Sequence, residues 1–480
     1  MVIKIIENII LDYPMLPEFS LLLWCFPAVC YYYSVWRFNY FFISLSTLFF
    51  FFIIFILLAC SKNPDTFYIG KRFYLGVPEK FMKLFCLLIG MVCLYLSLSS
   101  EYTNVSLDSF EYTICFVGIL LGSMVIISSG GFYILGCGLV VLCIFYYYPF
   151  WIKFSLKQQL IVIILSLISV SLYRYGWNIL NTEFSTTHYV PIRWWFEQLP
   201  LKVDSQICQD WYLRGLKGTF FIFISIYLAI VIIPLYLWSQ CRFIFPIPFV
   251  IFISSVPQFG IVFILVKGLG RFFLSSFTYW LPLCIFFGLV TVFLVLGVVL
   301  KDKYFDLNIS SIMGFGSVIF IANMYIFISF FQASSLKLFW GYLVIYFFTL
   351  LNICLIGFFI EHNYKEIFFF FRDWGALYQS DSFLALVFLF NVFVLYAIPP
   401  ISGYFGCYKY LLFVFEKLSL ELFFLTIFFN LAIIYLFVRW LRKYFGNELK
   451  TKFELNLSSS FYLYNQLFIQ ILFVFYYFIL

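Results

Sequence analysis

Long apolar stretches recur along the whole chain, and they constrain its fold more than any other feature. Each holds roughly 18–25 residues, and about 20 apolar residues of helix are enough to span the hydrocarbon core of a bilayer. Of the 480 residues, 65% are hydrophobic and only 11% are charged, which is far from the balance of a soluble domain. We therefore predict an all-α polytopic membrane protein with about fourteen transmembrane helices. The predicted spans are 17–34, 38–59, 82–100, 110–129, 131–151, 157–177, 218–239, 245–267, 279–300, 309–331, 337–360, 382–416, 419–441 and 461–480.

Charge, histidine and cysteine content exclude several classes of function. The formal net charge of +7 is spread through the predicted loops, and no loop is basic enough to bind nucleic acid. The two histidines, His188 and His362, fall in loops, whereas a haem held between helices needs paired ligands inside the membrane. The thirteen cysteines form no Cys-x-x-Cys pair. We expect no metal site, no redox cofactor and no nucleic-acid partner for this chain.

The predicted connections differ in character. Residues 60–81 carry several charged side chains, among them Glu79, and read as a solvated hairpin. Residues 178–217 form the longest polar segment, which is either an interfacial amphipathic helix, a docking surface or a plain loop. Residues Ile127–Gly131 read as a turn between two helices, since no Lys-Ser/Thr follows the glycines of a phosphate-binding loop.

The N-terminal residues and the aromatic content bear on where the protein is made. Residues Met1–Pro14 include Lys4, Glu7 and Asp12 and lack both a cleavable signal and an Arg- and Ser-rich transit sequence. The 71 phenylalanines and 37 tyrosines are typical of an AT-rich gene, such as an organellar one. We expect synthesis in the compartment where the protein is inserted.

Two predicted spans are interrupted by proline. Pro399, Pro400 and Gly403 lie within a long apolar run, and Pro234 lies within the seventh span. Proline removes a backbone donor and clashes with the preceding helical turn, so a break inside the membrane has to be satisfied by protein or by a polar cavity. Matching breaks five spans apart suggest two repeats around a shared translocation path.

Several fragments, in chain order, resemble the antiporter-like subunits of respiratory complex I, the proton-pumping NADH:ubiquinone oxidoreductase, and subunit 2 most of all. The matching fragments are Leu16-Pro-Glu-Phe19, Leu121-Gly-Ser-Met124 with Gly138-Leu139, Ile233-Pro-Leu-Tyr-Leu-Trp238, Ser310-Ser-Ile-Met-Gly-Phe-Gly316, Asp373-Trp-Gly-Ala-Leu-Tyr378 and Ala397-Ile-Pro-Pro-Ile-Ser-Gly-Tyr-Phe-Gly406. The resemblance implies an antiporter-like fold in one transmembrane domain, 1–480. It further implies inverted half-repeats at about 110–267 and 279–441, with peripheral helices in 1–109 and 461–480.

The chain departs from the family at its ionisable positions. In the family, a mid-membrane line of one Glu and several Lys is thought to move protons, and a charge at that depth costs roughly 3 kcal/mol, so it is kept for a role. The resemblance places the family Glu on Val140, three family Lys on Ala229, Gln258 and Cys407, and a family His on Gly314.

Four positions remain candidates for a proton path. Gln258 and Cys407 occupy family positions, and Lys409 lies two residues beyond one of them. Lys267 lies nine residues after Gln258 and either joins the path or extends from the end of its span to the membrane surface.

The resemblance implies a membrane-arm subunit of NADH:ubiquinone oxidoreductase in the mitochondrial inner membrane, or in a bacterial plasma membrane. Such a subunit either contributes to proton translocation or, with its Glu and Lys positions lost, acts mainly in assembly and conformational coupling. The resemblance places FMN, iron–sulfur clusters and ubiquinone on partner subunits, with other membrane-arm subunits and lipids as partners. The alternatives are a stand-alone cation/proton antiporter subunit, which should keep the Glu and Lys residues, and an unrelated flippase.

Overall fold

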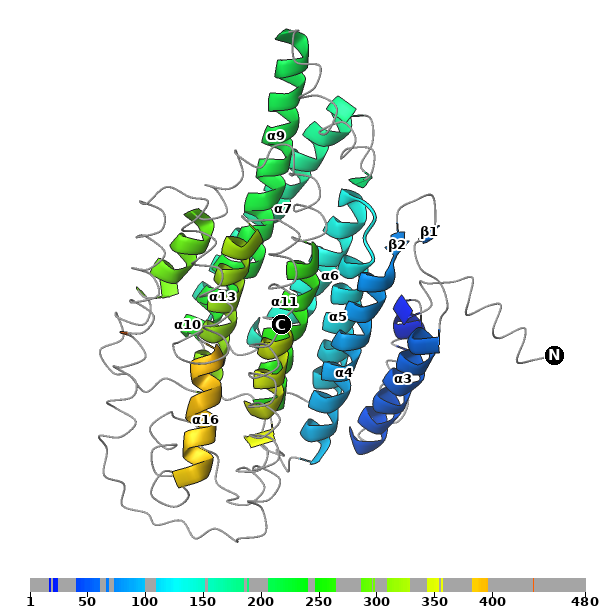
Figure 1. The fold of residues 1–480 in the computed structure, drawn as a ribbon, viewed down its shortest axis with the longest axis vertical. Helices are drawn as coiled ribbons and strands as arrows, with labels where there is room; N and C mark the ends of the chain where they lie inside the picture. Colours follow the sequence, from blue (N-terminus) through cyan, green and yellow to red (C-terminus); the bar gives the residue numbers. More distant parts are fainter. Residues whose placement is uncertain are drawn as a thin grey trace, which may run out of the picture. The chain divides into compact units, whose positions relative to one another are not determined.

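Long helices dominate the part of the chain that the structure describes (Figure 1). The structure is a computed structural model of residues 1–480. It describes residues 17–18, 20–24, 40–60, 66–68, 73–99, 109–151, 154–184, 188–189, 206–240, 247–264, 286–295, 297, 309–328, 343–353, 355–356, 382–395 and 435. The labelled elements are α3 (Tyr40–Cys60), β1 (Thr66–Tyr68), β2 (Phe73–Leu75), α4 (Val77–Ser99), α5 (Ser109–Ile127), α6 (Phe132–Trp151), α7 (Leu156–Phe184), α9 (Gln206–Tyr227), η2 (Leu228–Ile232), α10 (Ile233–Gln240), α11 (Ile247–Ile264), α13 (Ile309–Ile328) and α16 (Ser382–Leu395).

Four of the described helices are long and apolar enough to cross a membrane. They are Val77–Ser97, Phe132–Trp151, Leu156–Phe184 and Leu213–Trp238. Shorter apolar helices include Ser44–Ala59, Glu111–Ile127 and Pro248–Phe263. The chain is therefore a helical membrane protein, and the total of about fourteen spans stays a prediction.

The chain divides into two compact units. The first comprises Met1–Ile233 with Phe252–Phe277, and the second comprises Pro234–Ile251 with Thr278–Leu480. The boundaries differ from those of the half-repeats that the resemblance implies, and the half-repeats stay a prediction.

In the first unit, α3, α4, α5 and α6 lie side by side (Figure 1). The contact between α5 and α6 is close because glycine faces the neighbouring backbone. A Cβ on Gly122 would lie 2.8 Å from the Cα atom of Leu142, so any larger residue would force the two helices apart. Gly118 lies one turn earlier, and this Gly-xxx-Gly spacing is typical of helices that pack closely in membranes. The turn between these helices falls at residues 128–131, which confirms the interpretation of Ile127–Gly131.

Helices α7 and α9 form an antiparallel pair joined by polar contacts. The hydroxyl of Ser169 donates to the backbone oxygen of Ser225 at 3.0 Å, and the hydroxyl of Ser225 donates to the backbone oxygen of Ser169 at 2.7 Å. Near one end of the pair, Arg214 forms an exposed ion pair with Glu183 at 3.4 Å. Both helices extend into residues 178–217, so the interpretation of that whole segment as a loop is wrong. Helices α7 and α9 continue to pack against each other through polar residues, which a hydropathy pattern assigns to the loop between two spans.

A short β-hairpin of two three-residue strands joins α3 to α4 in an otherwise helical architecture, which agrees with the predicted helical membrane protein. Strands β1 and β2 pair antiparallel, with Phe67 opposite Tyr74. Aromatic and β-branched residues such as Thr66 favour extended backbone, which explains a short hairpin in a segment too polar to span a membrane. The prediction of a hairpin within 60–81 is confirmed.

The helix that contains Pro234 changes register instead of ending. A π-helical turn, η2, joins α9 to α10, and the N–H of Ile233 donates to the carbonyl of Leu228. In this i→i−5 register residue 234 would donate to the carbonyl of Ala229, but proline has no N–H. The hydroxyl of Tyr147, on α6, donates to that carbonyl at 3.1 Å. A side chain from a neighbouring helix thus satisfies the acceptor that proline leaves unpaired.

The second unit contains α10, α13 and α16 as its labelled helices. The rings of Phe320, on α13, and Tyr346 stack with centroids 3.6 Å apart. Trp238, on α10, is 1% exposed and lies against Gly314 of α13. Aromatic packing of this kind fills the space between helices where small residues admit large rings.

Candidate functional site

Three charged side chains are buried in the part of the first unit that the structure describes: Glu18, Glu79 and Lys83. Glu18 lies in the helical residues near the N-terminus, and Glu79 and Lys83 lie on the first two turns of α4. Glu18 is 2% exposed and Lys83 is 0% exposed. Burial of a charge is costly unless the charge is paired and hydrogen-bonded, so their surroundings decide what they do.

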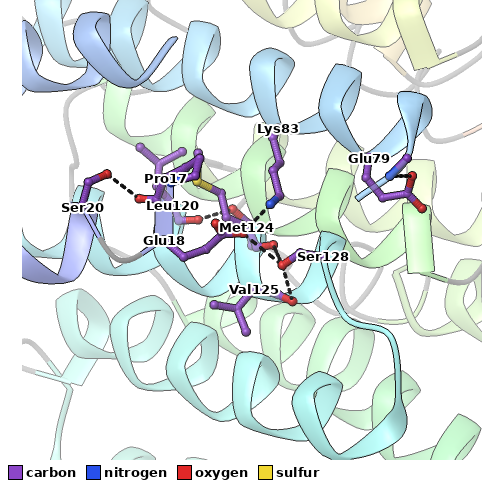
Figure 2. Close-up of polar contacts among 11 residues, drawn as sticks. Pro17, Glu18, Ser20, Glu79, Lys83, Leu120, Met124, Val125 and Ser128 are labelled. Atoms are coloured by element: carbon purple, nitrogen blue, oxygen red, sulfur yellow. Dashed lines mark hydrogen bonds and ion pairs between the residues drawn. The ribbon is translucent and has the colours of Figure 1, made fainter. Parts of the chain in front are cut away.

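Glu18 and Lys83 form a direct ion pair (Figure 2). The Nζ atom of Lys83 lies 2.5 Å from Oε1 of Glu18, across 65 residues of sequence. A charge-assisted hydrogen bond of this kind is stronger than a neutral one. The pair joins the N-terminal helical segment to α4, and removal of either partner would leave an uncompensated buried charge.

Ser128, at the end of α5, brings a third element to the pair. Its Oγ atom lies 3.0 Å from Oε1 of Glu18, 2.9 Å from the carbonyl of Met124 and 3.3 Å from that of Val125. A hydroxyl has one hydrogen to donate, so it can serve only one of these acceptors at a time. The other carboxylate oxygen, Oε2 of Glu18, is buried and has no hydrogen-bond partner among the described residues.

Glu79 has a different environment one helical turn before Lys83. Its Oε2 atom accepts a hydrogen bond of 2.9 Å from the backbone N–H of Gly76, just before α4 begins. A carboxylate at the third helical position commonly accepts from this N–H and stabilises the start of the helix. The interpretation of Glu79 as part of a solvated loop is therefore wrong, because α4 starts at Val77, before the apolar run, and the Glu79 side chain caps the helix and is 1% exposed.

The hairpin and the α5–α6 turn lie next to this group. The N–H of Tyr74, on β2, donates to the carbonyl of Ser128 at 2.9 Å. The hydroxyls of Ser129 and Tyr189 lie 3.3 Å apart, and His188 pairs with Gly131 in an isolated β-bridge. Burial raises the pKa of Tyr189, and the contact with Ser129 opposes this increase. Polar groups therefore continue from the ion pair to the connecting segments.

The structure places the family's ionisable positions in unlike surroundings. Val140, on α6, is 43% exposed. Ala229 is buried in η2, and Gln258 is 6% exposed on α11, directly after Pro257. Gly314 lies against Trp238, and a Cβ at this position would come within 3.0 Å of the indole ring, so no imidazole fits there without displacing the ring.

The remaining predicted positions lie outside the described residues. They are Lys267, Pro399, Pro400, Gly403, Cys407 and Lys409. Of the two proline breaks, the structure therefore describes only the one at Pro234. Among the described residues, no group of three or more His, Cys, Asp or Glu side chains could hold a metal ion.

The sequence interpretation missed the Glu18–Lys83 pair, although it contains a signal for both residues. Glu18 lies in the predicted span 17–34 and Lys83 in the predicted span 82–100. An ionisable residue inside a span is a functional-site hypothesis by default. Their pairing could not be read from the sequence, because nothing local links two residues so far apart.

Two solved structures resemble this fold along nearly its whole length. A chain of respiratory complex I from Thermus thermophilus, determined with bound aureothin, matches with a TM-score of 0.65 and 13% identity, covering 95% of this chain and 96% of that chain. A chain of a membrane-bound sulfane sulfur reductase, an archaeal respiratory membrane complex, matches with a TM-score of 0.68 and 13% identity, covering 96% of this chain and 75% of that chain. No protein-family model matches the sequence, and no curated protein sequence matches it. The protein therefore has a fold that is found in membrane-embedded respiratory complexes.

Proposed function

We propose that this protein is an antiporter-like membrane-arm subunit of a respiratory complex of the complex I type. The observation that carries the proposal is the agreement of fold over 95% of this chain and 96% of a complex I chain. Because the structural match covers nearly the full length of both chains, it reflects the arrangement of many helices and not of a single helix pair. The order of the sequence fragments, from Leu16 to Gly406, supports the same assignment independently.

The finer assignment is subunit 2, encoded in a mitochondrial genome and inserted in the mitochondrial inner membrane. The fragments Ala397-Ile-Pro-Pro-Ile-Ser-Gly-Tyr-Phe-Gly406 and Leu16-Pro-Glu-Phe19 support subunit 2. The abundance of phenylalanine and tyrosine supports an AT-rich organellar gene. Fourteen helices in inverted half-repeats, with broken helices at Pro234 and at Pro399-Pro400, belong to the same proposal.

The role within the complex follows from the side chains at the family's ionisable positions. Val140, Ala229, Gly314 and Cys407 cannot exchange protons as Glu, Lys or His do, and Gln258 can only hydrogen-bond water. Along this line the chain acts in assembly and in conformational coupling between neighbouring subunits, and any contribution to proton translocation uses other groups. Any proton path through the family's own line would need water near Gln258, Cys407, Lys267 or Lys409.

The partners are other membrane-arm subunits and the surrounding lipids. NADH oxidation requires FMN and iron–sulfur clusters, and the electrons pass to ubiquinone; we place all three on partner subunits. The chain itself carries no redox site. Its contribution to the enzyme is a membrane scaffold that responds to electron transfer elsewhere.

Purification in a mild detergent tests the proposal. A tag on this chain should co-purify flavin absorbance, iron–sulfur paramagnetic signals and NADH–quinone reductase activity. A tagged chain that migrates alone, at the size of one polypeptide in its micelle, would instead support a stand-alone antiporter subunit or a flippase. Density for the intact complex would then show whether water reaches Gln258 and Cys407.

A further inference from the structure

We propose that Glu18 and Lys83, with the hydroxyl of Ser128, form a buried proton-exchange site in the first unit. The ligand is a proton delivered by water. The inference deepens the proposed function and rests on it, because such a site has a use in a subunit of a proton-translocating complex. It differs from the family's mid-membrane line, since none of the three residues occupies a position where the resemblance places an ionisable residue of that line.

The first observation is the incomplete bonding of the Glu18 carboxylate. Lys83 and Ser128 both approach Oε1, at 2.5 and 3.0 Å, whereas Oε2 is buried without a hydrogen-bond partner among the described residues. A pair kept only for stability gains most when both oxygens are bonded, because an unsatisfied buried acceptor is costly. An open oxygen beside a satisfied one is the geometry of a carboxylate that can still accept a proton.

The second observation is the choice of acceptors open to Ser128. While Glu18 is a carboxylate, the hydroxyl hydrogen can point to Oε1 at 3.0 Å. When Glu18 is protonated on Oε2, Oε1 becomes a weaker acceptor and the same hydrogen can turn to the carbonyl of Met124 at 2.9 Å. The Ser128 hydroxyl is therefore hydrogen-bonded in both protonation states with no movement of heavy atoms.

The proton balance is simple. In the resting site the Lys83 ammonium and the Glu18 carboxylate have a summed charge of zero. Uptake of one proton from water forms one O–H bond on Glu18 and leaves the site with a charge of +1. Release of that proton restores the ion pair, and no other bond forms or breaks. No proton of Lys83 takes part in this balance.

Polar groups next to the site lie at the start of α4 and at the turn between α5 and α6. Glu79 lies one helical turn before Lys83 and is held at the start of α4 by Gly76. Ser128 is followed by Ser129, whose hydroxyl contacts Tyr189. Besides Glu18 and Lys83, the described charged or titratable residues of α4, α5, β2 and residues 188–189 are Tyr74, Glu79, Lys80, Cys86, Cys93, Tyr95, Glu111, Tyr112, Cys115, His188 and Tyr189. Figure 2 shows the side chains of Lys83 and Glu18 pointing toward one another between α4 and the end of α5, with Glu79 turned away along α4.

The test uses the intact complex in sealed liposomes, with NADH oxidation and internal acidification recorded together. Glu18→Gln should lower the number of protons moved per NADH oxidised, and Glu18→Asp should restore part of it. The matched control is Glu183→Gln, which removes the exposed pair with Arg214 and should leave the ratio unchanged. An unchanged ratio in Glu18→Gln, with the complex assembled, overturns the inference.

A second variant covers the case in which Glu18→Gln does not assemble. Glu18→Gln with Lys83→Met removes both charges, so no unpaired charge stays buried. This double variant should assemble and move fewer protons per NADH oxidised. An assembled double variant that moves the wild-type number of protons overturns the inference. Infrared difference spectra of the purified chain give a readout that does not need the complex. Acidification should produce a buried carboxylic acid band that Glu18→Gln removes and that Glu183→Gln and Glu79→Gln both keep. Absence of that band from the wild-type chain overturns the proton-exchange site, even if the chain co-purifies with NADH reductase activity. A chain that shows the band but migrates alone contradicts the proposed function instead.

Discussion

Substitution of Gly314 by alanine should destabilise the second unit, although alanine is the better helix former. A Cβ at this position would lie within 3.0 Å of three atoms of the Trp238 indole, including Cε2 at 2.6 Å. The nearest of these atoms lies at 2.1 Å and carbon atoms pack at about 3.5–4.0 Å, so the indole would have to move by about 1.5 Å. Trp238 is 1% exposed, so the ring has to move against the protein that surrounds it.

The magnitude follows from two opposing effects. Alanine favours a helix over glycine by about 1 kcal/mol. Overpacking of a filled interior costs about 1–3 kcal/mol, and a rigid indole ring places this site at the upper end of that range. The net expected loss is about 2 kcal/mol in the free energy of unfolding, or a factor of about 30 in the folded-to-unfolded ratio.

Reversible unfolding in mixed detergent micelles, followed by circular dichroism, measures this loss. Gly297→Ala is the matched control, because that glycine is helical and has no atom within 4 Å of its Cβ position. The control should be unchanged or gain up to about 1 kcal/mol. Equal effects of the two substitutions, or a Gly314→Ala variant as stable as the parent, would refute the packing argument.

Three further predictions concern the first unit. Lys83→Met should cost about 3–5 kcal/mol in the free energy of unfolding, because Glu18 stays buried without its cation. Lys83→Met with Glu18→Gln should recover most of this loss. Unfolding in mixed micelles compares the two variants, and equal losses would contradict the ion-pair argument. Ser225→Ala should cost only about 0.6 kcal/mol in the same assay, since interhelical hydrogen bonds in membranes are individually weak. Tyr147→Phe should cost about 1–3 kcal/mol, because it leaves the carbonyl of Ala229 buried without a donor; hydrogen exchange should then be faster in η2, and unchanged protection would argue against the contact with Tyr147.

Hydropathy was sufficient to predict the class of fold. Helices have to satisfy their backbone within the membrane, so long apolar runs allow few other structures. The start of α4 shows the limit of this reasoning. Glu79 made the first turn look like part of a polar connection, yet the structure buries Glu79 and Lys83 because each has a hydrogen-bond partner. Partners supplied by other parts of the fold are invisible to a hydropathy pattern.

The break at Pro234 was predictable in place but not in form. Proline implies an unpaired carbonyl, and the sequence shows where it occurs. It does not show that the helix would shift to a π-helical turn, or that Tyr147 would reach the carbonyl of Ala229 from another helix. The same holds for Gly314, since the space that its missing side chain leaves belongs to Trp238 of a different helix.

The sequence by itself determined that this is a helical membrane protein and where proline falls within its apolar segments. These properties depend on the residue types along one segment at a time. Tertiary structure alone decided that Glu18 meets Lys83 and Ser128, residues 65 and 110 positions away, in a buried site with one open oxygen. The physical reason is that the free energy of a buried charge depends on which atoms surround it, and packing between distant helices selects those atoms.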